Sequence, residues 1–294
     1  MQNIDLHQRC QDYLQRSLGT NLRILHAEPL TQSSRLAPWR LDAEVEGEKR
    51  SYVLRLGGEG CHHEYEFLRA MQSLPIPTPR VYDWDAEGTA LGVPCLLSDY
   101  IFGDSLLAPV LAGEAWAEDL YLDAVCQLQS ITLEQLAPVA DLLADCQSAA
   151  DVLEYANEYF QENSHPIAEK AYARLRATMP KLPELCFSNG DLWLDNFLVR
   201  DRQLAGIIDF ENAGFSDPLF EFLLSFFIRP ELKQRGLIER YCQRMHLDPG
   251  ALPWYHGLEY FDTLHWVLKL GKPFEQYSAQ VLEAALEEWL RATG

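Results

Sequence analysis

Hydrophobic side chains near the start of the chain follow first a helical and then a strand pattern. Over residues 4–18 they recur at helical spacing, and Gly19 follows as a signal that ends a helix. Residues 39–45 alternate apolar and polar side chains, and residues 51–56 do so again after a turn at 46–48. The pattern therefore predicts an amphipathic helix followed by two antiparallel strands.

A second helix and an apolar strand complete this strand-rich part. Apolar residues at helical spacing cover residues 61–73, and Pro75 follows as the first of three closely spaced prolines. A proline ends a helix because it has no amide hydrogen to donate and fixes its own φ. An apolar run at 93–100 predicts another strand, and the segment 102–105 after it is the one candidate domain boundary.

Helical spacing dominates beyond this boundary. It covers residues 151–161, 167–178 and 280–292, whereas residues 187–210 are typical of short strands and loops. The layout predicts an α+β protein, in which a small strand-rich part precedes a larger helical part. The strand-and-loop segment is inserted into the helical part.

Composition and charge narrow the classes of partner. The 294 residues are 48% hydrophobic, yet no apolar run approaches the roughly 20 residues that a membrane span needs. The net charge of −20 argues against nucleic acid and anionic membrane surfaces as partners, because both favour basic proteins. The seven cysteines form no Cys-x-x-Cys motif, and the first residues do not resemble a signal peptide. We therefore expect a cytoplasmic protein with reduced thiols.

The charge is distributed unevenly along the chain. Residues 81–169 contain many Asp and Glu residues but no Lys or Arg. One interpretation is a solvated surface that aids solubility. The other is a negative potential that attracts a cationic small molecule to the protein. The sequence leaves both interpretations open.

A polar motif between two apolar segments carries the candidate chemistry. Asp191 and Asn196 are five residues apart, and Asp209 closes the next apolar strand. In phosphoryl transfer a carboxylate orients the attacking hydroxyl and finally accepts its proton, while Mg²⁺ neutralises the polyphosphate. Mg²⁺ prefers oxygen ligands such as carboxylates and amides. The motif therefore favours Asp191 as the catalytic base and Asn196 and Asp209 as metal ligands.

These residues resemble the catalytic segment of the aminoglycoside phosphotransferase and choline kinase family, which is related to the protein kinases and includes fructosamine kinase relatives. The family pattern His-Gly-Asp-x4-Asn is matched at Gly190, Asp191 and Asn196, and Ile-Asp-[Phe/Trp]-[Glu/Asp] is matched at residues 208–211. Residues 213–218 also resemble the family pattern Ala-Gly-x-x-Asp-Pro. The resemblance implies that Asp217, within this segment, supports the catalytic loop by hydrogen bonds. The resemblance implies a protein-kinase-like two-lobed fold, with a small antiparallel-sheet N-lobe and a larger helical C-lobe.

The resemblance also implies the positions of the lobes and of the nucleotide. It places an N-lobe at residues 1–101, with a hinge at 98–101, and a C-lobe with the catalytic loop and acceptor site at 102–294. Arg55 takes the position of the family's phosphate-binding lysine, and Glu64 that of its ion-pair partner. The remaining implied nucleotide contacts lie in the phosphate loop and the hinge: Ser33, Ser34, Asp99, Tyr100 and Ile101.

Three features depart from the family pattern. Asn189 stands where the family has a histidine that organises the catalytic loop. Arg55 keeps the charge of the lysine it replaces, but a planar guanidinium contacts phosphate differently from a compact ammonium group. The phosphate loop, residues 31–35, contains no glycine, so serine hydroxyls and backbone amides would have to contact the phosphates.

Together these observations predict a Mg²⁺-dependent kinase. It would transfer the γ-phosphoryl group of ATP, with GTP as an alternative donor, to a hydroxyl of a small metabolite or aminoglycoside-like compound. The acidic stretch favours a cationic acceptor. The alternative is a nucleotide-binding pseudokinase that acts as a sensor or scaffold. Arg55 and Asn189 favour the pseudokinase, whereas the intact Asp191, Asn196 and Asp209 argue against it.

Overall fold

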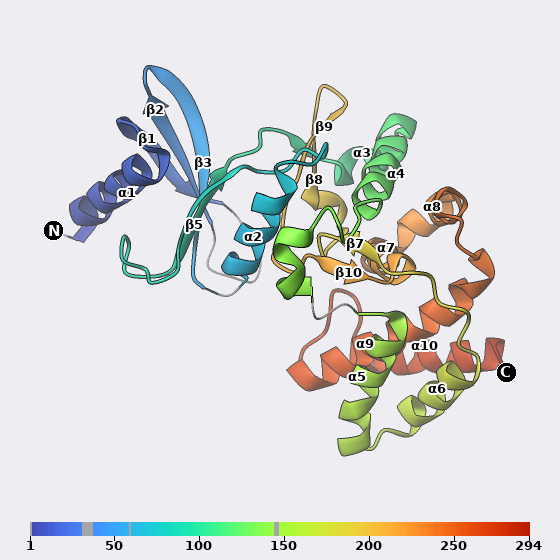
Figure 1. Cartoon of the computed structure of the whole chain (residues 1–294). Coiled ribbons are helices and arrows are strands. Elements are labelled where there is room, and N and C mark those ends of the chain that lie inside the picture. The colour runs from blue at the N-terminus through green and yellow to red at the C-terminus, as the bar shows by residue number, and fades with distance from the viewer. Residues whose placement is uncertain (1, 31–37, 59, 144–146) are drawn as a thin grey trace.

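A helix and a five-stranded antiparallel sheet form the N-terminal part of the chain (Figure 1). The computed structural model describes residues 2–30, 38–58, 60–143 and 147–294. Helix α1 (Gln2–Leu18) precedes the sheet, in which the strands lie in the order β1-β2-β3-β5-β4. The strands are β1 (Leu22–Pro29), β2 (Trp39–Val45), β3 (Glu48–Leu56), β4 (Val81–Asp85) and β5 (Cys95–Asp99).

The strand pattern confirms the sequence prediction in the centre of this sheet. β2 has the predicted bounds, and β3 begins at Glu48, slightly before the predicted start. Glu46 and Gly47 join the two strands and have φ of 53° and 86°, as a tight two-residue hairpin turn requires. The sequence pattern does not predict the edge strands β1 and β4. β1 exposes most of its side chains, and both edge strands have a break in their pairing register.

Helix α2 (Cys61–Met71) lies close to its predicted position and connects the sheet with the helical part. The buried hydrophobic side chains form two clusters. The smaller cluster includes Tyr13 of α1 and inward-facing residues of the sheet. The larger cluster includes Phe67 of α2 and continues through the helical part. Because α2 belongs to the larger cluster, its Glu64 is fixed relative to the helical part as well as to the sheet.

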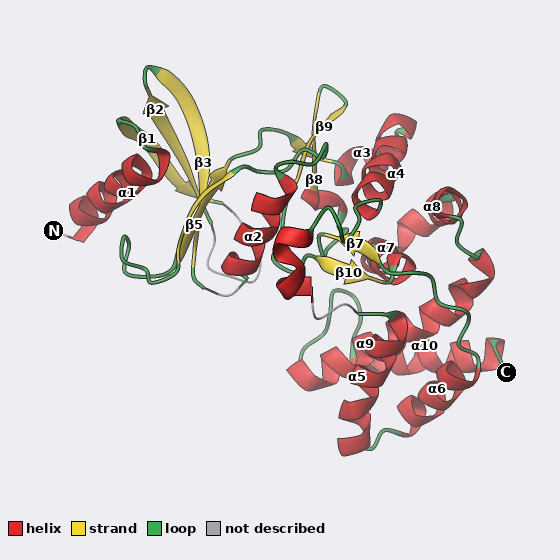
Figure 2. Cartoon of the chain, in the orientation of Figure 1, coloured by secondary structure: helices red, strands yellow, loops and turns green. Residues whose placement is uncertain are grey.

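Helices dominate the chain after residue 105 (Figure 2). They are α3 (Leu107–Ala112), α4 (Ala115–Gln129), α5 (Ala149–Glu162), α6 (Pro166–Ala177), α7 (Pro218–Ile228), α8 (Leu237–Met245), α9 (Leu252–Leu270) and α10 (Ala279–Ala292). The three helices predicted in this part are confirmed as α5, α6 and α10, which pack with α9. No helix in the described ranges is long and apolar enough to cross a membrane. The division into lobes after residue 101 stays a prediction.

The strand-and-loop segment predicted at 187–210 consists of short paired strands. The pairs are β7 (Cys186–Ser188) with β10 (Gly214–Ser216), and β8 (Phe197–Arg200) with both β9 (Gln203–Ile207) and β6 (Asp104–Ser105). The segment 102–105, predicted as a linker, thus contributes a two-residue strand. These pairings fix the β7–β8 and β9–β10 loops, which carry the candidate catalytic residues.

Candidate active site

The loop between β7 and β8 places Asp191 next to a glycine that no other residue could replace. Gly190 has a φ of 81°, and a Cβ atom added to it would lie 2.2 Å from the carbonyl oxygen of Asn212. The motif therefore needs glycine both for its backbone conformation and for the close approach of the β9–β10 loop. A 3-10 turn, Leu194–Asn196, then leads into β8.

The carboxylate of Asp191 is held by two hydrogen bonds. The side-chain Nδ2 of Asn196 donates to Oδ2 at 3.0 Å, and the backbone N–H of Trp193 donates to Oδ1 at 3.2 Å. Burial raises the pKa of Asp191 to about 6, against the effect of these two bonds, and the negative charge of Asp209 adds to the rise. Asp191 is therefore ionised at neutral pH and has a pKa high enough to accept a proton.

Asn189 is fully buried and connects the two loops. Its Nδ2 donates to the carbonyl oxygens of Asp191 at 2.9 Å, Ile208 at 3.2 Å and Asp209 at 3.2 Å. An amide has two N–H hydrogens, so three acceptors share them. The residue that replaces the family's histidine thus ties the loop of the candidate base to the loop of the candidate metal ligand.

Asp209 has an unusual backbone conformation, with φ of 64°. This left-handed region is disfavoured for residues with a side chain, although Asp tolerates it better than most. The N–H of Ile208 donates to the carbonyl oxygen of Asn196 at 3.0 Å, which fixes the two loops against each other. Asn196 donates both of its hydrogen bonds to Asp191 from Nδ2. The side-chain oxygen of Asn196, Oδ1, is the atom that suits a metal ion. The oxygen donors of Asn196 and Asp209 fit Mg²⁺, which takes few protein ligands beside phosphate and water.

Arg55 on β3 forms ion pairs with several carboxylates. Its Nη1 contacts the carboxylate of Glu64 and lies 3.9 Å from Oδ1 of Asp209, while its Nη2 donates to Oε2 of Glu211 at 2.7 Å. The pair with Glu64 agrees with the sequence prediction. Sequence reasoning gave no role to Glu211, although it belongs to the matched motif. The guanidinium holds two carboxylates at once through separate nitrogens, which a lysine ammonium does less well.

The hinge segment follows β5. The N–H of Asp99 donates to the carbonyl oxygen of Arg80 at 2.8 Å, and that of Tyr100 donates to Ser51 at 3.1 Å. Both groups therefore stabilise the N-terminal part of the chain. An N–H contact with adenine in the hinge that the family resemblance implies would therefore fall to Ile101, whereas the carbonyl oxygens of this segment are not excluded by these bonds.

One cavity of about 240 Å³, here called the hinge cavity, brings most of the predicted nucleotide and metal residues together. Its lining includes Arg55, Glu64, Asp99, Tyr100, Ile101, Asn196 and Asp209. The predicted phosphate-loop residues Ser33 and Ser34 lie outside the described residues. The structure therefore joins β3, α2, the hinge and both catalytic loops around a single space.

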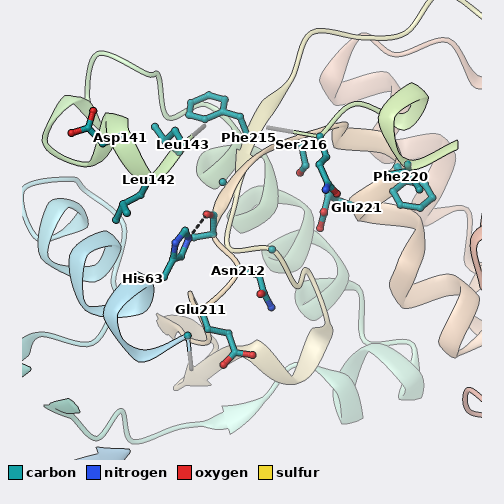
Figure 3. A pocket seen from close by; sticks show the side chains of 16 residues that line it. His63, Asp141, Leu142, Leu143, Glu211, Asn212, Phe215, Ser216, Phe220 and Glu221 are labelled. Carbon is teal, nitrogen blue, oxygen red and sulfur yellow. Dashed lines mark hydrogen bonds between the residues drawn. The ribbon is translucent and has the colours of Figure 1, made fainter. Parts of the chain in front are cut away.

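Two larger cavities adjoin the catalytic loop at Gly190. The loop cavity, about 620 Å³, is lined by His63 and Glu211 on one side and by Glu221 on the opposite side (Figure 3). Nε2 of His63 is 2.7 Å from the carbonyl oxygen of Ala213, which ties α2 to this wall. The α9 cavity, about 420 Å³, is lined mainly by residues of α7 and α9. Gly190 and Glu221 line both cavities, so the two spaces are neighbours.

The ionisable side chains in the walls of these two cavities are mostly carboxyl groups. Among the described residues the lining contains no Lys or Arg, and its acidic residues are Asp141, Glu211, Glu221, Glu259 and Asp262. Burial raises the pKa of Glu221 to about 7, and the negative charge of Asp191 adds to this rise. Burial likewise raises the pKa of Glu259 and of Asp262. A cationic ligand would favour the ionised form of these groups.

The acidic stretch at 81–169 contributes little to either cavity. Asp141 is its one carboxylate in the described lining. Others form ion pairs elsewhere, such as Glu118 with Arg235 and Arg240 near α8. The attraction of a cationic ligand by this stretch stays a prediction, and the described walls of the two cavities give it little support. The sequence contains no basic residue within the stretch, but the fold brings arginines from a distant segment to it.

Asp217 caps helix α7. Its Oδ1 accepts hydrogen bonds from the N–H groups of Leu219 at 3.0 Å and Phe220 at 3.1 Å, and its Oδ2 accepts from the hydroxyl of Tyr255 at 2.8 Å. The implied support of the catalytic loop is wrong as a direct contact. Asp217 instead orients α7, the helix that carries Glu221, against α9.

Comparison with protein families decides the classification. Residues 12–258 match the model of the phosphotransferase enzyme family, APH. The chain belongs to this phosphotransferase family. The match covers the sheet, α2 and both catalytic loops, and it confirms the resemblance found in the sequence.

Solved structures of aminoglycoside phosphotransferases share the fold. Aminoglycoside phosphotransferase APH(4)-Ia has a TM-score of 0.69 at 16% identity, over 98% of this chain and 99% of that chain. A thermostable mutant of that enzyme, in a ternary complex with AMP-PNP and hygromycin B, has a TM-score of 0.68 at 18% identity, over 96% and 98%. The GDP complex of aminoglycoside 2′-phosphotransferase-IIIa has a TM-score of 0.64 at 19% identity, over 92% and 94%. The predicted protein-kinase-like α+β fold is confirmed.

A mammalian protein contains a related segment. Acyl-CoA dehydrogenase family member 10 of Mus musculus is 21% identical over 256 residues, which are 82% of this phosphotransferase chain. The chain spans 22% of the length of that relative. The similarity is therefore confined to one segment of a longer protein.

Proposed function

We propose that this phosphotransferase is a Mg²⁺-dependent small-molecule kinase that transfers the γ-phosphoryl group of ATP to a hydroxyl of a cationic acceptor. The position of Asp191 is the main support. Asp191 is hydrogen-bonded to Asn196, which lines the hinge cavity together with Asp209. Gly190, its neighbour in sequence, lines both larger cavities. The candidate base is therefore next to a space for the nucleotide and to spaces for the acceptor.

The hinge cavity is the proposed nucleotide site, between an N-lobe at 1–101 and a C-lobe at 102–294. Adenine would contact the hinge at 98–101, and Arg55, fixed by Glu64, would contact the phosphates. Mg²⁺ held by Asn196 and Asp209 would neutralise the charge on the polyphosphate. ATP is the proposed donor, and GTP is the alternative to be tested beside it.

Asp191 acts as the base in the proposed reaction. Its carboxylate accepts a hydrogen bond from the acceptor hydroxyl and orients the oxygen toward the γ-phosphorus. As the new O–P bond forms, the bond from the γ-phosphorus to the β–γ bridging oxygen breaks and ADP leaves. The hydroxyl proton passes to Asp191, whose pKa of about 6 suits a group that must accept and then release a proton.

The acceptor is proposed to carry a positive charge because of the carboxyl groups in the loop and α9 cavities. Glu259 is buried and Glu221 is partly buried, and the described lining contains no Lys or Arg. An anionic acceptor would be repelled, and a cationic one attracted, at a site where the surrounding protein focuses the field. The support for a cationic acceptor thus comes from residues after position 210 and not from the acidic stretch.

A screen of acceptors tests this function. Purified protein with Mg²⁺ and ATP or GTP is incubated with aminoglycosides, amino sugars, fructosamines and choline-like amines, and transfer of phosphate is measured. We expect transfer to an amine-containing alcohol, with KM that rises modestly with salt, because ions screen the approach of the cation but screen buried carboxylates much less than exposed ones. Glu221→Gln should raise that KM and reduce its salt dependence.

Two results of the screen would contradict the proposal. If the best acceptor were neutral and its KM did not depend on salt, the proposal of a cationic acceptor would be excluded. Mg²⁺-nucleotide binding without transfer to any acceptor, and without ATP hydrolysis, would favour the pseudokinase instead.

A further inference from the structure

The wall of the α9 cavity is largely apolar, although carboxyl groups lie in it. Leu224 and Phe227 come from α7, Trp266 and Leu270 come from α9, and Phe274 follows α9. Phe227 is buried, whereas Trp266, Leu270 and Phe274 are 39%, 58% and 37% exposed. Single exposed apolar side chains are common, but three that line one cavity form a surface suited to an apolar ligand group.

This apolar wall is continuous with the catalytic site. Gly190 and Glu221 line the α9 cavity and the loop cavity alike, and Gly190 directly precedes the base Asp191. The charges of Glu221 and Asp191 are close enough to affect each other. Asp191 itself lines neither cavity, so a ligand with its hydroxyl at Asp191 would reach the α9 cavity past Gly190 and Glu221.

Glu259 provides a polar contact within the cavity. Its side chain is 6% exposed, and Oε2 is 3.1 Å from Nδ1 of His256. Its Oε1 is buried and has no hydrogen-bond partner among the described residues. Buried carboxylate oxygens are usually paired, so this oxygen has an unmet capacity for a hydrogen bond, although it has almost no accessible surface in this conformation. The α9 cavity therefore combines apolar walls with carboxyl side chains in its lining, those of Glu221, Glu259 and Asp262.

We propose that the α9 cavity binds an apolar arm of the acceptor, which makes the substrate an amphiphilic amino alcohol. This inference rests on the proposed kinase function. The hydroxyl lies at Asp191, the ammonium group lies near Glu221 and Glu259, and an alkyl or aryl arm covers Trp266 and Leu270. A fully polar sugar ring in this cavity would leave hydroxyl groups against the apolar wall without partners, which costs binding free energy.

Binding of simple alkylammonium ions tests the cavity without requiring catalysis. The full-length protein is titrated by calorimetry with n-propyl-, n-butyl-, n-pentyl- and n-hexylammonium. We expect Kd to fall about fourfold for each added methylene, which corresponds to about 0.8 kcal/mol for a buried CH₂. Leu270→Ser should reduce this dependence on chain length. Leu133→Ser is the matched control, because Leu133 is 57% exposed and lines none of the three cavities.

Equal affinity for propyl- and hexylammonium in the wild type would overturn the inference. So would an identical response of Leu270→Ser and Leu133→Ser. A change of oligomeric state in Leu270→Ser, with no binding of alkylammonium to the wild type, would assign the apolar surface to a second copy of the chain instead.

A second experiment separates this inference from the proposed function. Phosphate transfer to ethanolamine is compared with transfer to N-butyl- and N-hexylethanolamine, with the expectation that kcat/KM rises with chain length. Transfer that is independent of chain length contradicts the apolar subsite and leaves the kinase function standing. Chain-length-dependent binding with no transfer to any of these alcohols upholds the subsite and contradicts the proposed acceptor.

Discussion

The hinge cavity and the two larger cavities differ in how their charges are balanced. In the hinge cavity the guanidinium of Arg55 pairs with Glu64, and its other nitrogen reaches Glu211. In the α9 cavity the described lining contains no Lys or Arg, and the cationic influences on Glu259 are His256, 3.1 Å away, and Lys233, which both lower its pKa against the effect of burial. The first site suits a ligand that arrives with its own counterion, as a magnesium nucleotide does. The second suits a ligand that is itself a cation.

Backbone geometry differs between the two sites as well. Asp209, in the hinge cavity, has a left-handed backbone conformation that the buried amide of Asn189 helps to hold. The acidic residues of the α9 cavity lie instead on regular helices, Glu221 on α7 and Glu259 on α9. The nucleotide side is thus built from irregular loops with fixed hydrogen bonds. We expect its function to be the more sensitive of the two to single substitutions.

The largest effect is expected at the base between the two sites. Asp191→Ala should lower kcat by about 10²- to 10⁴-fold, the usual contribution of a general base, and should leave nucleotide binding nearly unchanged. Asp195→Ala is the control, because Asp195 lies in the same loop but is exposed. Steady-state kinetics and calorimetry measure the two quantities. Near-normal turnover in folded Asp191→Ala would remove Asp191 as the base.

The next effect concerns the metal ligands of the hinge cavity. Asp209→Asn should lower kcat by about 10²- to 10³-fold, as expected when a charge that stabilises the transition state is lost. It should also weaken binding of the magnesium nucleotide. Asn196→Ala should have a smaller effect, because water can replace a neutral ligand. Calorimetric titration of both variants with Mg²⁺-AMP-PNP decides the point, and wild-type affinity in Asp209→Asn would exclude it as a ligand.

A smaller effect tests the ion pairs on the nucleotide side. Arg55→Ala should raise the nucleotide KM about tenfold, the equivalent of one charged hydrogen bond of about 1.5 kcal/mol. Arg55→Lys should retain activity but lower Tm, because one ammonium group serves Glu64 and Glu211 less well than a guanidinium. Arg50→Ala, an exposed arginine on the same strand, provides the control. If Arg55→Ala matched Arg50→Ala in KM, another cation would have to contact the phosphates.

The smallest effect is a shift in pH dependence. Burial raises the pKa of Asp191 to about 6, and only its ionised form can accept a proton, so kcat/KM should fall as pH drops through about 6. The amide of Asn196 lowers this pKa, and Asn196→Ala should therefore move the midpoint to higher pH. Initial rates from pH 4.5 to 8.5 measure both midpoints. If the midpoint in Asn196→Ala equalled that of the wild type, a group other than Asp191 would control the fall of kcat/KM at low pH.

The sequence predicts much of the fold because the periodic segments keep their local preferences. The hairpin of β2 and β3 follows from alternation and from Gly47, and helices α5, α6 and α10 follow from helical spacing. The edge strands β1 and β4 are absent from the prediction. Their pairing is irregular and β1 exposes most of its side chains, so neither strand is marked by a regular alternation of buried and exposed residues.

The candidate site likewise contains residues that the sequence predicts and residues whose role depends on the tertiary fold. The spacing of Asp191, Asn196 and Asp209 is local and could be recognised in the sequence. The bond of Arg55 to Glu211 and the buried position of Glu259 on α9 depend on the tertiary fold. In the sequence Glu259 is an ordinary helical glutamate, so no pattern could have marked it as part of a cavity.

The bond between Arg55 and Glu211 also bears on how the protein is made. The two residues are 156 positions apart in the chain, and translation at about 5–20 residues per second separates their synthesis by roughly 8 to 30 s. During that interval the nascent sheet presents the Arg55 guanidinium without its second partner. Closing so long a loop carries an entropic cost that must be met before the contact stabilises the fold. The contact between Arg55 and Glu211 can therefore form only after the chain has been synthesised through helices α3 to α6, while helices α7 to α10 still follow.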